Sequence, residues 1–453
     1  MRKYDLTEKK EMEALAKLYR DFLDAGKTER ECAAEVCRIA EAHGFRNLDI
    51  ILENGEKLEA GAKIYAVCKK KVVMLMEIGE EDLEKGMLFV GSHIDSPRLD
   101  IKQNPFYENS GMAYMDTHYY GGIKKYLWVA SPMALHGTVV KKDGTCVEIS
   151  IGENPNEPVV GVSDLLIHLS QKHLKKEAAV VVEGENLDIL VGTTPAEEEG
   201  VDNPVKTHVL NLLKEQYGIE EKDFVSAELE VVPAGKARDF GLDSSMIMAY
   251  GQDDRICAFT SLMAFLHSEK NTKTKVCLMV DKEEVGSIGA TGMKSRFMEN
   301  TVAEVMELLG QYSELKLRRA LKNSCMLSSD VNAGYDPLYA EAFEKNNAAY
   351  LGKGAVITKY TGSRGKSGSN DANPEFIAKL RQIFDDAKVE YQTAELGRID
   401  VGGGGTIAYI PAEYGMDVID LGVAILNMHA PYEICSKADV YETTKCYKAF
   451  YEM

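Results

Sequence analysis

The stretch from Lys275 to Gly292, KVCLMVDKEEVGSIGATG, constrains the fold and the function of this chain more than any other segment. An apolar run ends at Asp281, and the adjacent carboxylates of Glu283 and Glu284 follow it. A short apolar run bounded by turn residues is typical of a buried strand, and ligands in open α/β sheets bind beyond the carboxyl ends of the strands. The segment therefore predicts a strand that ends at a functional site, although an isolated Glu-Glu pair more often belongs to a solvated surface.

The same arrangement recurs in four other places, where a β-type run or a turn delivers His, Asp or Glu at its end. These places are His93 with Asp95, Asp253 with Asp254, Asp330, and His429. Each one alone is weak evidence, because a lone His is more often a structural hydrogen-bonding residue and a lone Asp a helix cap. Together they supply imidazole and carboxylate groups without thiolate, a ligand set that suits zinc, manganese or cobalt at a hydrolytic site.

The spacing of these residues indicates separate tasks. A metal-binding imidazole needs a partner on its other ring nitrogen, and the carboxylate of Asp95 is placed to orient His93. Adjacent residues at a strand end point in different directions, so one glutamate can bind metal while the other takes a proton from water. The carboxylate of Asp253, just before a predicted helix, could bridge two cations at the roughly 3.5–4 Å spacing of two-metal hydrolases.

Composition excludes several classes of protein. The net charge of −19 argues against a nucleic-acid partner, which requires a basic surface. Hydrophobic content of 45% with 28% charged residues is ordinary for a folded chain. The nine cysteines form no Cys-x-x-Cys pair and are expected to be reduced core thiols. We find no apolar signal core and no apolar stretch that could span a membrane, and we expect a cytoplasmic protein without a membrane partner.

The length of 453 residues predicts two domains, and the pattern of the sequence changes where we expect their boundaries. Residues 1–98 and 241–453 show an α/β rhythm, which predicts a discontinuous catalytic domain with a mixed sheet flanked by helices. Residues 99–240 consist mostly of short β-type runs punctuated by Pro and Gly, which predicts an inserted β-rich domain. We expect helices at 7–26, 28–44, 162–173, 255–267, 293–321 and 374–387. We expect strands at 63–67, 71–76, 87–90, 126–129, 135–140, 146–151, 180–182, 229–232, 276–280, 325–328 and 418–425.

Five motifs in this order resemble those of the aspartyl aminopeptidase family of dinuclear zinc exopeptidases, in particular its bacterial branch. They are GSHIDSPRLD, GQDDRICAF, DKEEVGSIGATG, SSDVNAG and NMHAPYE, and they run from His93 to His429. The resemblance therefore covers most of the chain. It implies a metal-dependent aminopeptidase that releases N-terminal residues from peptides with a free N-terminus, with acidic residues as the candidate preference.

The resemblance also implies a role for each matching residue. One metal ion would be held by His93 and Asp330, the other by Glu284 and His429, and Asp253 would bridge the two. Glu283 would be the general base that removes a proton from the attacking water, and Asp95 would orient His93. His168 and Lys359 would contact the substrate, His168 by reaching across a dimer to the partner's active site. The implied cofactors are two divalent ions per subunit, zinc before cobalt or manganese.

The resemblance further implies that the inserted domain is a dimerisation domain and that the chain assembles as a homo-oligomer, a dodecamer built from dimers. Two departures from the eukaryotic members stand near the metal motifs. Asp254 replaces an Asn, and Ala333 stands where those members carry a further substrate-contacting His. These departures leave the metal ligands intact and leave the preferred N-terminal residue open.

Three other functions fit parts of the sequence. A dinuclear deacylase acting on a non-peptide amide would use the same metal site, and it differs in needing no free α-amino group. A nucleotide-binding protein is suggested by the glycine-rich stretches 361–369 and 402–405, but Tyr360 occupies the first glycine position of a phosphate loop. We expect these stretches to be flexible loops that line the active site. A non-catalytic assembly protein would have lost part of the ligand set, which is complete here.

Overall fold

The computed structural model describes residues 2–453, and these residues form two compact units. The first unit comprises the chain up to Asp95, Ala237–Met428 and Glu433–Met453. The second comprises Ser96–Lys236 together with His429–Tyr432. None of the helices in residues 2–453 has both the length and the apolar character needed to cross a membrane.

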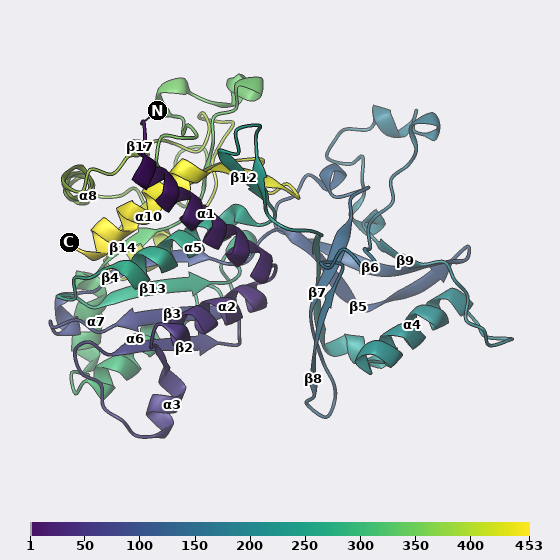
Figure 1. The fold of residues 1–453 in the computed structure, drawn as a ribbon, viewed down its shortest axis with the longest axis horizontal. Helices are drawn as coiled ribbons and strands as arrows, with labels where there is room; N and C mark the ends of the chain where they lie inside the picture. The colour runs from purple at the N-terminus through teal and green to yellow at the C-terminus, as the bar shows by residue number, and fades with distance from the viewer. Residues whose placement is uncertain (1) are drawn as a thin grey trace. The chain divides into compact units, whose positions relative to one another are not determined.

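The first unit is built around a mixed sheet of nine strands in the order β1-β2-β3-β13-β4-β14-β18-β16-β17. Its strands, several of which are labelled in Figure 1, are β1 (Arg46–Asn47), β2 (Lys63–Cys68), β3 (Val72–Glu77), β13 (Lys275–Val280), β4 (Leu88–His93), β14 (Cys325–Ser328), β18 (Asp417–Gly422), β16 (Ala355–Thr358) and β17 (Tyr391–Thr393). The four central strands β13, β4, β14 and β18 are parallel to one another. Their carboxyl ends therefore lie at the same edge of the sheet.

Both faces of this sheet are buried, because successive residues of a strand point to opposite faces and here both sets are apolar. In β13, Cys277 and Met279 pack into one hydrophobic core, whereas Val276, Leu278 and Val280 pack into the other. The first core receives the apolar sides of α1 (Leu6–Ala25), α2 (Glu29–Ala42), α5 (Gln252–His267), α8 (Pro374–Asp386) and α10 (Lys437–Tyr451). The second receives α3 (Leu48–Glu53), α6 (Phe297–Leu308), α7 (Glu314–Asn323) and α9 (Tyr409–Ala412). The expected α/β class with a mixed sheet flanked by helices is confirmed.

Local signals account for several of these elements. Helix α2 begins where the sequence predicts, because Thr28 accepts a hydrogen bond from the amide of Glu31 and the Glu31 carboxylate accepts one from the amide of Thr28. The single helix expected at 293–321 is instead two helices, α6 and α7, separated by a turn at Gly310, whose φ of 68° favours glycine.

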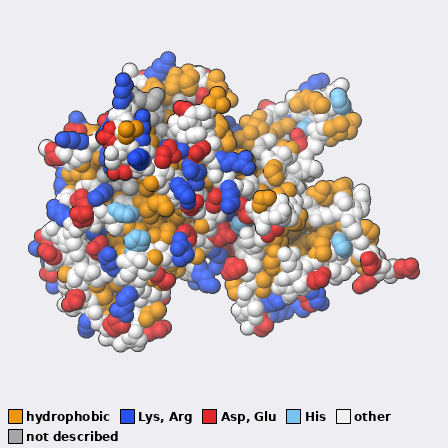
Figure 2. All heavy atoms as spheres, viewed as in Figure 1, with side chains coloured by type: hydrophobic (Ala, Val, Ile, Leu, Met, Phe, Trp, Pro, Cys, Tyr) orange, Lys and Arg blue, Asp and Glu red, His pale blue; other side chains and the backbone are white. Residues whose placement is uncertain are grey.

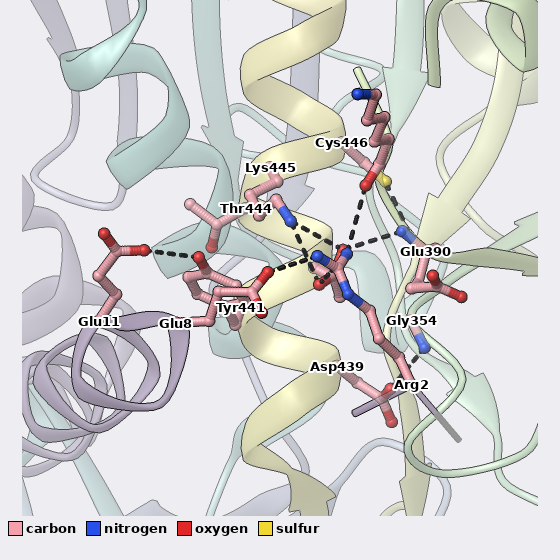
Figure 3. Close-up of polar contacts among 12 residues, drawn as sticks. Arg2, Glu8, Glu11, Gly354, Glu390, Asp439, Tyr441, Thr444, Lys445 and Cys446 are labelled. Atoms are coloured by element: carbon pink, nitrogen blue, oxygen red, sulfur yellow. Dashed lines mark hydrogen bonds and ion pairs between the residues drawn. The ribbon is translucent and has the colours of Figure 1, made fainter. Parts of the chain in front are cut away.

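Polar side chains of helix α10 form hydrogen bonds to the N-terminal segment and to the residues that precede β16 and β17 (Figure 3). The carboxylate of Glu442 accepts hydrogen bonds from the guanidinium of Arg2 at 3.3 Å and from the backbone amide of Glu390 at 2.8 Å. The carboxylate of Asp439 accepts from the amides of Gly352 and Gly354, both at 2.7 Å. These contacts bind three segments, distant from one another in the sequence, to one helix in the first unit.

A smaller sheet in the first unit has the order β11-β12-β20-β19-β15. It consists of β11 (Arg238–Phe240), β12 (Met246–Ala249), β20 (Glu433–Ser436), β19 (Ala424–Leu426) and β15 (Asn332–Ala333). The single strand expected at 418–425 is thus divided into β18 and β19, which belong to different sheets.

The second unit contains an antiparallel sheet in the order β8-β7-β10-β5-β6-β9. Its strands are β8 (Cys146–Ile151), β7 (Met133–Val140), β10 (Ala227–Pro233), β5 (Arg98–Asn109), β6 (Met112–Tyr120) and β9 (Ile189–Gly192), and α4 (Pro204–Tyr217) accompanies them. The helix expected at 162–173 is wrong: only the short 3-10 turns Ile167–Leu169 and His173–Lys175 form there. The strands expected at 126–129 and 180–182 are wrong as well, since the first segment holds a 3-10 turn and the second a bend.

Candidate metal centre

The carboxyl ends of the central strands bring three of the expected ligands together. His93 is the last residue of β4, Asp330 follows β14 by two residues, and Asp253 lies at the start of α5. Ligand atoms of His93, Asp253 and Asp330 all lie within 4.8 Å of one another. The Nε2 atom of His93 is 3.2 Å from Oδ1 of Asp253. Two strand ends and a helix start, distant in the sequence, thus place an imidazole and two carboxylates around one point.

The start of α5 is irregular where it presents these carboxylates. Asp253 and Asp254 have non-helical backbone angles, and the regular helix runs from Arg255 onward. The amide of Asp253 donates to the carboxylate of Glu433 at 3.0 Å. The side-chain amide of Gln252 donates to the carbonyl oxygen of Glu433 at 2.6 Å. Glu433 therefore fixes the backbone from which the Asp253 carboxylate projects.

The loop after β13 carries the two adjacent glutamates, and Asp95 holds its backbone. The amide of Glu283 donates to Oδ1 of Asp95, and the amide of Glu284 donates to Oδ2, each at 3.2 Å. Nδ1 of His93 lies 3.0 Å from the backbone carbonyl oxygen of Asp95 and 3.3 Å from its Oδ1. Asp95 thus contacts the imidazole through its backbone and its side chain, and its carboxylate holds the amides of both glutamates.

The two glutamate side chains point to different partners. Oε2 of Glu283 lies 4.0 Å from Nε2 of His93. A carboxylate oxygen of Glu284 lies within 4.8 Å of one of Asp253. Both side chains are partly exposed, unlike the buried Asp95. The two carboxylates thus lie beside different groups, and their separate tasks stay a prediction.

His429 opens the segment His429–Tyr432, which belongs to the second unit. Its Nδ1 lies 2.7 Å from the carbonyl oxygen of Gly122 in the same unit. A proton donated from Nδ1 to this carbonyl makes Nε2 the nitrogen that can bind a metal. The backbone of His429 has a φ of 65°, a left-handed conformation that is uncommon for residues other than glycine. Its role as a ligand stays a prediction.

Buried negative charge dominates the electrostatics of the centre. Burial raises the pKa of Asp254 well above its usual range. Burial also raises the pKa of Asp330, and the charge of Asp254 raises it further. For His93, burial by itself lowers the pKa, but hydrogen bonds with Asp253 and Asp95 raise it well above its usual value. A divalent cation among these groups would offset the repulsion, and imidazole with carboxylate oxygens is a donor set that zinc accepts.

His168 and Lys359 are not brought to this group by any contact within the described residues. His168 is exposed on the second unit, in the 3-10 turn Ile167–Leu169. Lys359 is half exposed, and its Nζ lies 3.8 Å from Oδ1 of Asp371. Strand β16, which precedes Lys359, runs antiparallel to β18. The chain after β16 therefore leaves the sheet in the direction opposite to the carboxyl ends of β4 and β14.

The two glycine-rich stretches pack against each other. The amide of Gly362 donates to the carbonyl oxygen of Gly404 at 2.7 Å. A Cβ atom on Gly402 would lie 2.0 Å from the carbonyl oxygen of Leu396, so only glycine fits there. The two loops border a cavity of about 320 Å³ that is lined by Tyr360, Arg364, Lys366, Glu395 and Arg398 among others. That these loops line the active site stays a prediction.

Sequence reasoning assigned no role to three residues that the structure places in or beside this group. Asp254, Asp281 and Glu433 are all buried acids, and each accepts hydrogen bonds from the backbone of a site segment. Of the three, only Glu433 has a feature in the sequence that points to the site, because it is the last residue of the motif NMHAPYE. Because such acids bind backbone amides rather than a ligand, their chemistry does not distinguish them from surface carboxylates in the sequence.

Comparisons with known proteins identify the family of the chain. Residues 22–451 match the family model described as aminopeptidase I zinc metalloprotease (M18). The chain is 58% identical over 448 residues to a probable M18 family aminopeptidase 1 of Clostridium acetobutylicum, with 99% of this chain and 96% of that protein covered. It is 44% identical to the corresponding protein of Thermotoga maritima, with 98% and 97% covered.

Solved structures show the same fold. The crystal structure of the M18 aminopeptidase from Thermotoga maritima superposes with a TM-score of 0.95 at 43% identity, covering 100% of this chain and 99% of that one. Aminopeptidase I from Clostridium acetobutylicum gives a TM-score of 0.93 at 56% identity, with 99% and 97% covered. The mApe1 dodecamer of S. cerevisiae shares the fold at 21% identity, with a TM-score of 0.78 and 96% of each chain covered.

These comparisons support the aminopeptidase and give no support to the deacylase alternative. The family match covers nearly the whole chain, and it includes every residue that we expect to bind metal. The chain therefore belongs to the M18 family of aminopeptidase I zinc metalloproteases and is a metal-dependent aminopeptidase.

Proposed function

We propose that this aminopeptidase holds two divalent metal ions at the carboxyl edge of the main sheet. His93 and Asp330 would hold one ion, Glu284 and His429 the other, and Asp253 would bridge them. The observation that carries the proposal is the grouping of His93, Asp253 and Asp330 within 4.8 Å, with Glu284 equally close to Asp253. His429 is joined through its peptide bond to Met428, which packs against the first core of the main sheet.

Glu283 is the proposed general base and general acid. When bound, the metal ions lower the pKa of a water molecule and act as Lewis acids on the peptide carbonyl. Glu283 removes the proton from the attacking water and delivers it to the leaving amine. One feature favours Glu283 over Glu284: its Oε2 lies 4.0 Å from Nε2 of His93, whereas Asp95 holds the backbone amides of both glutamates. Asp95 acts through His93 and Glu283 and is a positioning residue.

The acidic surroundings suit a substrate with a free α-amino group. The carboxylates at this site carry more negative charge than two divalent ions would neutralise, and a cationic N-terminus adds compensating charge. They are Asp95, Asp253, Asp254, Glu283, Glu284 and Asp330. We therefore propose peptides with a free N-terminus as substrates. An N-terminally acetylated peptide lacks this charge and should not be cleaved, whereas a deacylase would accept it.

The preferred N-terminal residue depends on the side chains that meet it. Lys359 is the candidate partner of an acidic side chain, and His168 is a candidate contact from a neighbouring subunit. Ala333 lies at the end of β15, where eukaryotic members of the family carry a His that contacts the substrate, and alanine has no polar group for this contact. We propose that a preference for an acidic N-terminal residue rests on Lys359 alone. Because the Lys359 side chain is half exposed, water would weaken its attraction to an acidic side chain.

We also propose that the chain forms a homo-oligomer, a dodecamer built from dimers, through its second unit. Large apolar side chains are exposed in one segment of this unit, namely Leu165, Leu166, Ile167, Leu169 and Leu174, with exposed fractions of 45% to 68%. Figure 2 shows hydrophobic side chains on the visible surface of the molecule among charged ones of both signs. Contiguous exposed apolar surface often marks an interface between proteins. Light scattering of the purified protein tests this assembly.

A cytoplasmic location is supported by the cysteines. All nine are free thiols, and six of them are buried. Reduced thiols are the norm in the cytosol, whereas exported proteins more often carry disulfides. Activity in the soluble fraction of lysed cells, with none in the washed membranes or culture medium, is the expected result.

Hydrolysis of aminoacyl-p-nitroanilides with Asp, Glu, Leu, Met or Lys, each with zinc, cobalt or manganese, tests the proposed function. We expect cleavage that a chelator abolishes, and about two metal ions per subunit in the active protein. His93→Ala and His429→Ala should each lose one ion. One ion per active subunit, or full occupancy in either variant, would overturn the proposed ligand set.

A further inference from the structure

The loop that carries Glu283 begins at Asp281 and returns to it at Thr291. We propose that Asp281 and Thr291 form a positioning pair, which closes this loop and thereby sets the carboxylate of Glu283 for proton transfer. The inference rests on the proposed role of Glu283 as the base. Neither residue belongs to the proposed ligand set.

Two hydrogen bonds join the two ends of the loop, and a third holds its first residue. Oδ2 of Asp281 accepts from the hydroxyl of Thr291 at 2.6 Å. The amide of Asp281 donates to the carbonyl oxygen of Thr291 at 3.1 Å. Oδ1 of Asp281 accepts from the amide of Lys282 at 2.7 Å. One carboxylate oxygen of Asp281 thus accepts from Lys282 near the start of the loop, and the other accepts from Thr291 near its end.

The hydrogen bonds of Asp281 continue those of Asp95 along the backbone. The amide of Lys282 donates to Asp281, and the next two amides, those of Glu283 and Glu284, donate to Asp95. Three successive amides are therefore held by two carboxylates. The amides of Glu283 and Glu284 flank the Cα of Glu283, so their bonds to Asp95 fix the direction of its Cα–Cβ bond. The bond from Lys282 to Asp281 fixes the position of the residue that precedes Glu283.

The loop needs such a closure because its backbone is strained. Lys282 and Ser287 have φ values of 71° and 61°, and both are non-glycine residues in the left-handed region. A Cβ atom on Gly292 would lie 2.3 Å from the carbonyl oxygen of Ser287, so the loop folds tightly over its own end. Strained backbone persists only where surrounding contacts hold it, and Asp281 supplies contacts at both ends.

The burial of the pair excludes a direct role with substrate. Asp281 is fully buried, and Thr291 is 5% exposed. Both oxygens of Asp281 already accept hydrogen bonds from the loop itself. A pair in this position acts on catalysis only through the placement of the loop, so its loss should lower kcat more than it changes KM.

Thr291→Val tests the proposal, because it removes the hydroxyl and preserves the shape of the side chain. We expect kcat to fall about 10- to 100-fold, as for a small misplacement of a catalytic group, with KM within about 2-fold and metal content unchanged. Thr291→Ser keeps the hydroxyl and should restore kcat to within about 3-fold of the parent protein. Asp281→Asn, which keeps only one acceptor oxygen, should resemble Thr291→Val.

Thr301→Val is the matched control. Thr301 is also 5% exposed, and its hydroxyl donates to the carbonyl oxygen of Phe297 at 2.8 Å within α6. This variant should lose stability and keep its kcat. An unchanged kcat in Thr291→Val, an equal loss in Thr291→Ser, or a Thr291→Val protein that is unfolded or metal-free would each overturn the proposal.

Glu283→Gln, measured beside these variants, separates the inference from the proposed function. If Glu283→Gln keeps substantial turnover, the base assignment fails, and with it the function of the pair. If Glu283→Gln is inactive while Thr291→Val turns over like the parent protein, only the positioning pair is refuted. Loss of kcat in both, with metal retained in both, is the expected result.

Discussion

Replacing Asp95 by Asn should disable the enzyme without unfolding it. The carboxylate accepts from the amides of both Glu283 and Glu284, at 3.2 Å each, and it lies 3.3 Å from Nδ1 of His93. An Asn side chain keeps one acceptor oxygen, and its NH2 group then faces one of the two amide donors. The substitution therefore removes at least one charge-assisted hydrogen bond and leaves a buried donor without an acceptor.

The size of the effect follows from the number of bonds lost. A hydrogen bond to a charged group contributes about 1.5–3 kcal/mol. If this contribution is lost in the transition state, kcat falls about 10- to 150-fold, since each 1.4 kcal/mol is about a factor of ten. Misorientation of His93 should also weaken metal binding by about 10- to 100-fold, as for other residues that support metal ligands.

The assay compares kcat of the parent protein and Asp95→Asn at zinc concentrations that saturate both, with metal content measured in the same samples. Asp21→Asn is the control for loss of one negative charge, because Asp21 is exposed and forms an ion pair with Lys17 on the surface of α1. A kcat of Asp95→Asn within about 2-fold of the parent protein at saturating zinc would refute the positioning role of Asp95.

Three further predictions concern the packing, the pH response and the metal. Gly422→Ala should weaken zinc binding at least about 10-fold, because the new Cβ would lie 1.8 Å from the carbonyl oxygen of Asp330; an unchanged zinc titration would contradict this. Burial raises the pKa of Asp439 to about 7, above its unfolded value of about 3.9. Between these two pH values the carboxyl group is ionised in the unfolded state and still protonated in the folded state. The free energy of unfolding should therefore fall by up to about 4 kcal/mol as the pH rises through this range. Urea titrations of Asp439→Asn should lack this slope, and an identical slope would refute the assignment. Chelation should lower Tm, since bound metal at 100 times its Kd adds about 2.7 kcal/mol, and re-added zinc should restore it.

The sequence predicts three of the four central strands, although β4 runs on to His93, three residues past its expected end. The apolar runs at 276–280, 87–90 and 325–328 all form buried strands, and the acidic or imidazole residues after them lie at one edge of the sheet. Short apolar runs are informative here because a strand buried on both faces has no polar side to alternate. The parallel order of the strands then places residues distant in sequence together.

The incorrect secondary-structure predictions in the second unit have physical reasons as well. Residues 162–173 and 180–182 contain apolar side chains that are exposed in the second unit, so their hydrophobicity does not report burial within this chain. The long hairpin of β5 and β6 was not predicted, and for β5 the reason is a sequence rich in Lys, Gln, Asn and Glu. Antiparallel sheets that expose one face tolerate such residues, and the hydrogen-bonded ladder supplies the order.

The contacts that orient the metal centre could not be predicted from local pattern. The binding of Asp95 to the amides of the 283–284 loop joins residues 188 and 189 positions apart, and that of Glu433 to Asp253 spans 180. Buried acids that accept backbone hydrogen bonds look like ordinary surface carboxylates until the fold brings the amides to them. The sequence therefore indicates which residues carry the chemistry better than it indicates which residues hold them.

The most direct test of the account is the turnover of Glu283→Gln with its metal content measured in the same preparation. The substitution preserves the size of the side chain and removes its ability to accept a proton. We expect a fully metal-loaded protein whose kcat falls at least about 100-fold, at the low end of the contribution of general base catalysis. A metal-loaded Glu283→Gln protein with nearly normal kcat would contradict the assignment of Glu283 as the base, and the mechanism built on it.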